Sequence, residues 1–237
     1  MSRFNLDIKN LIEYHLYMSR NFNFEIKEYY HCYGRGTDKR KVFLSKKDYQ
    51  RFIALLFVCN SVDTIHLSDH SEKSFYDLFL LERENTLVDI GAYCLMPNHF
   101  HLLLREKNEN GISLFMQKLI TAYTMYFNKK NERSGALFES RFKARHVNID
   151  KYLKYLFSYI HLNPVKLINP EWRKDGIKNI NETKKFLEKY DYSSYLDYLK
   201  SDRPQYKTLN LNGFPDYFGE RKIFEHELWD WLNYNDE

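Results

Sequence analysis

The sequence contains 237 residues with a formal net charge of +4 at pH 7, and 43% of its residues are hydrophobic. This length and composition suit one globular domain with an extension, or two small domains. No stretch approaches the roughly 20 consecutive apolar residues that cross a bilayer, and the first residues lack the apolar core of a signal peptide. We therefore expect a cytoplasmic protein with no membrane segment. Cys32, Cys59 and Cys94 are far apart, which argues against a disulfide framework or a zinc knuckle.

The charge is unevenly distributed along the chain. Residues 128–154 contain eight Lys and Arg residues against three acids, whereas residues 201–237 contain eight acids against four bases. A basic segment in a chain with 17% aromatic residues suits binding to nucleic acid. A solvated charged surface would produce the same pattern, so the charge leaves both interpretations open.

The first predicted elements, in chain order, are a strand and a helix. Residues 29–36, YYHCYGRG, predict an aromatic strand that ends in a Gly-Arg-Gly turn and displays Arg35 on a loop. The spacing of the apolar residues predicts an amphipathic helix within residues 45–60. Residues 60–72 are expected to form a loop, and residues 71–85 a short helix.

A hairpin and two longer helices follow in the prediction. Residues 86–96 and 99–106 predict two strands that turn at a Pro-Asn dipeptide. A helix is expected from about residue 113 to residue 130, and another over residues 150–164 after the basic loop. The order strand, helix, hairpin, helix predicts an α+β fold, an antiparallel sheet with helices on one face. The order fits a ferredoxin-like plan, although the pattern alone does not fix that topology.

The strand after the Pro-Asn turn carries two histidines, His99 and His101, within PNHFHLLL. Successive side chains of a strand point to opposite faces, so both imidazoles are expected on the same face. This is a geometry that suits metal ligands, although an isolated H-x-H pair is more often structural. The pair alone therefore leaves its role open.

The last long helix is predicted from DKYLKYLFSYIHLNP, with Asp150 as its N-cap and Pro164 as its end. Tyr159 and Asn163 are four residues apart, which places them ~40° apart around a helix axis, while His161 lies ~200° from Tyr159. We therefore expect Tyr159 and Asn163 to share a site that excludes His161. Tyr152 and Tyr155 lie on the same side of the helix, so at this point the choice of Tyr159 depends on its offset from Asn163.

The candidate ligands His99, His101 and Asn163 would form a partial coordination sphere that leaves room for water and phosphate oxygens around a divalent ion. All three are neutral, so the ion would keep its double charge and could polarise a phosphodiester. The Tyr159 hydroxyl is a candidate nucleophile, because a nearby cation lowers the pKa of tyrosine from ~10. The combination predicts covalent phosphoryl transfer.

Four segments, in this order, resemble the REP-associated tyrosine transposases, a branch of the HUH-type single-tyrosine transposases: YCLMPNHFHLLL, SGALFESRFKARHV, SYIHLNPVK and YDYSSY. The similarity extends over about residues 29–200. It implies a ferredoxin-like nuclease domain that acts on single-stranded DNA, often beside a hairpin. It places the family's histidine pair on His99 and His101, its nucleophile on Tyr159 and its third ligand on Asn163.

The resemblance implies a cofactor, partners and further contacts. DNA would be cleaved and rejoined through a 5′-phosphotyrosine intermediate with magnesium or manganese, at palindromic repeat hairpins or other single-stranded DNA. Backbone phosphates would be held by basic residues, namely Arg35, Arg141, Lys143 and Arg145. A monomer is expected, with a dimer as the alternative.

The same resemblance divides the chain into an N-terminal extension (1–28), an HUH-type domain (29–168) and a partly helical C-terminal extension (169–237). The segment VKLINPEW after the last long helix departs from the family's usual VRAGLV, so the turn there is expected to be rebuilt. Two other functions stay open: a metal-dependent phosphodiesterase that uses activated water, and a non-catalytic protein that binds hairpin DNA.

Overall fold

The structure is a computed structural model that describes residues 23–63, 65–70, 72–199, 202–215, 224–226 and 228–229. The predicted N-terminal extension therefore lies mostly outside the described residues, as does the chain beyond residue 215 apart from a few positions. The division of the chain at residues 28 and 168 stays a prediction. Within the described part, no helix has the length and apolar character that crossing a membrane requires.

Among the described residues, one sheet of antiparallel strands has the order β2-β3-β1-β4. The strands are β1 (Tyr29–Arg35), β2 (Val88–Met96), β3 (His99–Glu106) and β4 (Lys143–Val147). A helix connects β1 to β2, a tight hairpin connects β2 to β3, and a second long helix connects β3 to β4. This is the split strand-helix-strand topology of a ferredoxin-like fold, so the predicted fold class is confirmed.

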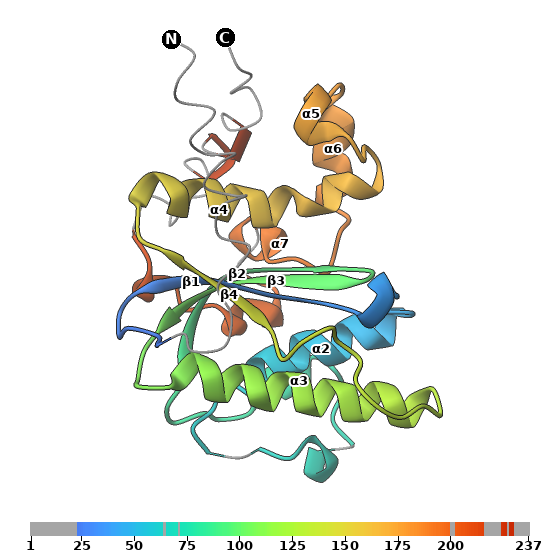
Figure 1. Cartoon of the computed structure of the whole chain (residues 1–237), viewed down its shortest axis with the longest axis vertical. Coiled ribbons are helices and arrows are strands. Elements are labelled where there is room, and N and C mark those ends of the chain that lie inside the picture. The colour runs from blue at the N-terminus through green and yellow to red at the C-terminus, as the bar shows by residue number, and fades with distance from the viewer. Residues whose placement is uncertain are drawn as a thin grey trace.

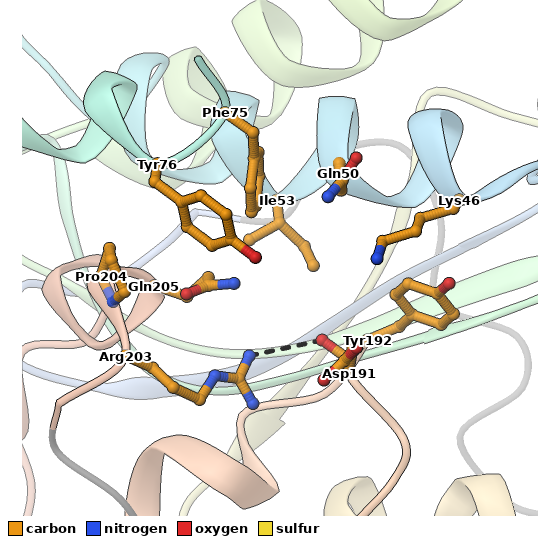
Figure 2. A pocket seen from close by; sticks show the side chains of 10 residues that line it. All are labelled: Lys46, Gln50, Ile53, Phe75, Tyr76, Asp191, Tyr192, Arg203, Pro204 and Gln205. Atoms are coloured by element: carbon orange, nitrogen blue, oxygen red, sulfur yellow. Dashed lines mark hydrogen bonds between the residues drawn. The ribbon is translucent and has the colours of Figure 1, made fainter.

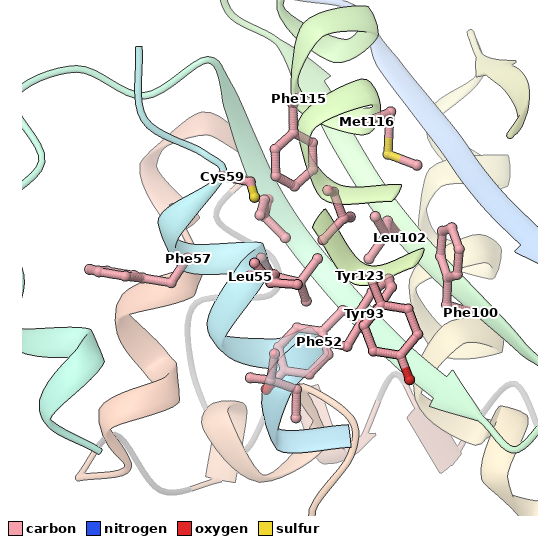
Figure 3. Packing of buried hydrophobic residues seen from close by; sticks show 14 of the residues in the cluster. Phe52, Leu55, Phe57, Cys59, Tyr93, Phe100, Leu102, Phe115, Met116 and Tyr123 are labelled. Atoms are coloured by element: carbon pink, nitrogen blue, oxygen red, sulfur yellow. The ribbon is translucent and has the colours of Figure 1, made fainter. Parts of the chain in front are cut away.

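Two helices, α2 (Lys46–Val58) and α3 (Gly111–Lys130), cover one face of the sheet, as predicted (Figure 1). A capping box between Ser45 and Asp48 starts α2. Between the helices and the sheet, Phe52 packs its ring 5.1 Å from Phe100 and 5.0 Å from Tyr123, measured between ring centres (Figure 3). This side of the sheet is a closed aromatic core.

One detail of the predicted first strand is wrong. β1 continues through Arg35, which is therefore an exposed residue at the end of a strand and not a loop residue, and Gly36 has an ordinary φ of −60°. The glycine at position 34 serves packing instead of a turn. A Cβ on Gly34 would lie 2.7 Å from the ring of Phe100, so only glycine leaves room for that ring.

The two short segments after α2 also differ from the prediction. The segment expected to be a loop contains a 3-10 turn (Leu67–His70), and the expected short helix is a 3-10 helix (Asp77–Leu80). Such short 3-10 pieces are common connectors, and sequence periodicity does not detect them.

The opposite face of the sheet carries α4 (Asp150–Leu162), which packs on β2, β3 and β4 (Figure 1). Helices therefore cover both faces of the sheet, and the predicted restriction to one face is wrong. The N-cap of α4 is Ile149, and Asp150 is the first helical residue, where its charge still favours the helix dipole. The α-helix ends at Leu162, and a 3-10 helix (Asn163–Leu167) follows directly. Pro164 lies in the first turn of this 3-10 helix, where proline is tolerated, so the chain stays helical beyond it.

Three short helices extend this second layer: α5 (Trp172–Asp175), α6 (Ile180–Leu187) and α7 (Tyr195–Leu199). Leu187 and Tyr195 are buried together with Phe157 of α4. The region after residue 168 is thus partly helical, as expected, and it shares a core with α4. One part of the sheet face under α4 is therefore filled by a hydrophobic core, and the candidate site lies next to that core.

Candidate active site

The strand register places the candidate ligands on the α4 face. His101 pairs with Tyr33 of β1, and His99 pairs with Arg35. Directly opposite residues of an antiparallel pair point to the same face, so all four side chains lie on one side. Phe100, between the two histidines, points into the aromatic core on the other side. The ring centres of His99 and His101 are 5.0 Å apart, so the two imidazoles lie side by side as predicted.

Tyr159 reaches this pair from α4. Its ring centre is 5.4 Å from that of His101, in an edge-on contact. Tyr152, Tyr155 and Tyr159 form a ladder along the helix, with successive ring centres 6.1 and 6.0 Å apart. Burial raises the pKa of Tyr155, and it raises that of Tyr152 to about 12. Of these three tyrosines, Tyr159 is the one whose ring contacts a histidine of the predicted pair.

Asn163 lies one helical turn beyond Tyr159, at the C-cap of α4, and it is fully buried. It lies beside His99 without the geometry of a hydrogen bond, so neither Oδ1 nor Nδ2 has a partner. Nε2 of His101 is also buried without a partner. Each buried polar group left unpaired costs roughly 1–3 kcal/mol, so such groups in one place call for a ligand.

These residues fit a divalent ion. Burial, with Arg35 as the next cause, lowers the pKa of His99 to about 4, and burial holds the pKa of His101 well below its usual value. Both rings are therefore neutral at pH 7 and offer lone pairs. Within the described part of the chain, no cluster of three or more His, Cys, Asp or Glu residues could hold a metal. The fit therefore depends on the amide of Asn163 as the third donor.

Three residues that the sequence analysis did not single out lie at this site. Arg173 of α5 places its guanidinium carbon 4.3 Å from the ring centre of Tyr159. Burial, with Arg173 and Arg35 as further causes, lowers the pKa of Lys166 to about 8. His31 of β1 lies within hydrogen-bond distance of His101, and burial lowers its pKa to about 3. Had the pairing of β1 with β3 been known, strand alternation would have placed His31 on the same face as His101. No local pattern indicates Arg173 or Lys166.

The predicted phosphate-binding residues divide into two groups. Lys143 and Arg145 pair with Tyr33 and His31, so they point to the α4 face together with Arg35. The guanidinium of Arg145 lies 4.5 Å from the ring centre of Tyr152. Arg141 occupies an exposed position ahead of β4. The structure thus brings three of the four basic residues to the face that carries Tyr159.

His161 lies away from this site, as the helical spacing predicts. It is fully buried between α4 and α7, where Nδ1 donates to the carbonyl of Phe157 at 2.9 Å. Its Nε2 accepts from Oγ of Ser194 at 2.7 Å. Both nitrogens are satisfied, so His161 is a structural residue.

A cavity of about 140 Å³ lies elsewhere, between α2 and the segments that follow α6 and α7 (Figure 2). Lys46, Tyr76, Arg203 and Gln205 face it. None of its lining residues belongs to the candidate site, which is packed between β1, β3 and α4.

The sequence profile of the family described as "Transposase IS200 like" matches residues 53–163. This segment contains the histidine pair, Tyr159 and Asn163. The resemblance to the tyrosine transposases is confirmed. IS200-like transposases are thus the proteins that the central half of this chain resembles, and the four candidate residues lie where that similarity is found.

Two individual proteins are also similar to parts of this chain. A protein of Haemophilus influenzae that carries the provisional name REP-associated tyrosine transposase is 31% identical over 85 residues, which are 32% of this chain and 48% of that protein. The chain thus spans about half the length of this relative. A solved REP-associated tyrosine transposase bound to a REP hairpin superposes with a TM-score of 0.47 at 12% identity, over 78% of this chain and 86% of that chain.

Proposed function

We propose that this protein is a transposase and endonuclease that cleaves and rejoins single-stranded DNA through a 5′-phosphotyrosine intermediate. Tyr159 is the nucleophile, and His99, His101 and Asn163 hold magnesium or manganese. The observation that carries this proposal is the contact between the rings of Tyr159 and His101, 5.4 Å between centres, beside the unpaired amide of Asn163. In a protein that resembles IS200-like transposases, this arrangement suits phosphoryl transfer better than a structural role.

The reaction begins when the Tyr159 hydroxyl oxygen attacks the scissile phosphorus and gives up its proton to solvent. The bond from phosphorus to the 3′ oxygen breaks, that oxygen takes up a proton, and the 5′ phosphate stays on Tyr159. A bound divalent ion supplies polarisation of the phosphate. Arg173, 4.3 Å from the Tyr159 ring centre, favours the negative charge that develops on the phenol. Attack by another 3′-hydroxyl reverses these steps and frees Tyr159.

The partner that fits this chemistry is single-stranded or hairpin DNA. Lys143, Arg145 and Arg35 give the α4 face positive charge next to Tyr159, and Arg141 extends it. Phosphate contacts of this kind position the strand without reading its sequence. Because a relative carries the name REP-associated tyrosine transposase, we propose palindromic repeat hairpins as the targets of this protein. We further propose a monomer acting in the cytoplasm, with residues 29–168 as its HUH-type domain between the two extensions.

The deciding experiment uses the full chain, a labelled hairpin-flanked single strand, and magnesium or manganese. We expect a protein–DNA adduct that survives denaturing electrophoresis and disappears in Tyr159→Phe, because phenylalanine lacks the nucleophilic oxygen. Tyr155→Phe is the matched control, one rung along the same ladder, and it should still form the adduct.

Two results would contradict the proposal. Free nicked DNA from Tyr159→Phe, without any adduct, would indicate a phosphodiesterase that uses water. Salt-sensitive hairpin binding by the wild type with no cleavage would indicate a non-catalytic binding protein.

A further inference from the structure

His31 is a third imidazole at the site, and the proposed reaction does not use it. It is 8% exposed and lies on β1, with its Nε2 2.9 Å from Nδ1 of His101. The two rings stack with their centres 5.0 Å apart and their planes 25° from parallel. A hydrogen bond between two buried imidazoles restricts both rings, so it is a specific arrangement and not a loose contact.

The protons of this pair determine what His101 can do. A neutral imidazole carries one N–H, and the short contact has room for a single proton between the two nitrogens. If His101 donates from Nδ1, its Nε2 keeps a lone pair. If His31 donates instead, the proton of His101 must sit on Nε2, and that nitrogen can no longer bind a metal.

The surroundings of His101 favour the first arrangement. Its Nε2 is buried and has no hydrogen-bond partner. A buried N–H without an acceptor is rarer in proteins than an acceptor without a donor, so a lone pair is the less costly state there. The ring of Tyr159 lies against both imidazoles, 5.4 Å from His101 and 6.2 Å from His31 between centres. The tautomer of His101 is therefore set within the cluster that contains the proposed nucleophile.

We propose that His31 is a positioning residue for His101: it accepts the Nδ1–H of His101, fixes the tautomer with an unprotonated Nε2, and holds the orientation of that ring. Metal-binding histidines generally donate their other ring N–H to a neighbour, most often a carboxylate or a backbone carbonyl. Here the acceptor is a neutral imidazole, so the site gains orientation without negative charge. The proposed tautomer does not depend on the proposed function, whereas its role in metal binding rests on that function.

The tautomer is tested first in the metal-free full chain, by long-range proton–nitrogen NMR correlation of the histidine side chains at pH 7. We expect His101 to be protonated at Nδ1 and not at Nε2 in the wild type, and His31→Phe to abolish this preference. Protonation of His101 at Nε2 in the wild type would overturn the proposal, whatever the variants do.

Manganese binding, followed by electron paramagnetic resonance with the metal alone, tests the consequence. His31→Phe keeps an aromatic ring in place but removes the acceptor, and we expect it to weaken manganese affinity about 10- to 100-fold. His31→Gln supplies an amide oxygen as acceptor and should recover part of the loss. Tyr33→Phe, on the same strand and face, is the control and should bind as the wild type does.

The outcomes separate this proposal from the proposed function. Equal manganese affinity in His31→Phe and wild type would overturn the positioning role even if the wild type forms a DNA adduct. The expected tautomer and affinity loss in a protein that forms no adduct would support the positioning role and contradict the proposed reaction. If His31→Phe fails to fold, the wild-type tautomer and His31→Gln decide the question.

Discussion

The two faces of the sheet use the same strands in opposite ways. On the face covered by α2 and α3, the polar groups that Tyr123 and Asp48 bury are bonded: the phenol of Tyr123 donates to the carbonyl of Val42, and Asp48 accepts from Lys130. On the face covered by α4, His101 and Asn163 bury polar atoms that have no partner. Arg51 on α2 and Thr124 on α3 also bury a polar atom without a partner, so the difference is that the unpaired atoms on the α4 face belong to candidate metal ligands.

Strand β3 serves both faces within three residues. His99 and His101 face α4, while Phe100 between them is fully buried in the aromatic core. Substitutions along this strand should therefore separate folding from chemistry, and comparison of neighbouring positions tests whether the two faces are as distinct as the contacts indicate.

The largest effect on stability is expected from Phe100→Ala. The ring packs 5.1 Å from Phe52 and 5.6 Å from Phe138 between centres, and its removal leaves a cavity in a closed core. We expect the free energy of unfolding to fall by about 3–5 kcal/mol, measured by urea denaturation. His99→Ala is the neighbouring control and should change it by less than about 1 kcal/mol. Similar losses in both variants would contradict the division between the faces.

Asp48→Asn tests the charge that the core face does bury. Burial raises the pKa of this carboxyl, but hydrogen bonds, with Lys130 first, outweigh burial and leave the pKa lowered. A lowered folded-state pKa contributes stability above the unfolded value of ~3.9, and that contribution is lost as the pH falls through the folded value. At pH 7 we expect the free energy of unfolding of Asp48→Asn to be about 2–3 kcal/mol below that of the wild type. This gap between the two proteins should close below about pH 4.

Urea denaturation at several pH values between 7 and 3 measures this gap. Asp38→Asn is the control, because the Asp38 side chain is 80% exposed and its ion pair with Arg40 lies at the surface. A gap that stays constant down to pH 3 would show that the loss in Asp48→Asn does not come from the carboxylate charge.

Asn163→Leu tests the unpaired amide on the α4 face. Leucine has a similar volume and no polar atoms, so we expect the free energy of unfolding to rise by about 1 kcal/mol while the DNA adduct is lost. Asn60→Leu is the matched control, because Asn60 is also buried but bonds Leu87 and Val88. It should lower stability by about 2–3 kcal/mol. Equal destabilisation in both variants would make Asn163 a structural residue.

The smallest effect is expected from Arg173→Gln. Its guanidinium lies over the Tyr159 ring but Arg173 itself is exposed, so the interaction contributes about 0.5–2 kcal/mol. We expect the single-turnover rate of adduct formation to fall about 2- to 30-fold with no change in unfolding. The exposed neighbour Lys174 is the control, as Lys174→Gln. Unchanged rates in Arg173→Gln would remove this residue from the site.

Local periodicity grouped the residues of the proposed site, and the resemblance to the tyrosine transposases indicated what they do. Alternation along β3 placed His99 and His101 on one face, and the helical repeat placed Tyr159 and Asn163 on one side of α4, away from His161. Both periods are properties of the backbone dihedrals, so they hold whatever the rest of the chain does. The same reasoning predicted an α+β fold, and the resemblance to the tyrosine transposases implied its ferredoxin-like topology.

Contacts between distant segments could be decided only by the tertiary structure. His31 meets His101 because β1 lies next to β3, and Arg173 meets Tyr159 because the chain after α4 brings α5 back over that helix. The role of Gly34, which local patterns assigned to a turn, likewise depends on the ring of Phe100 across the sheet. The sequence alone determined which side chains share a face, because that follows from local geometry. Which faces meet follows from burial of the whole chain at once, and no local pattern contains that information.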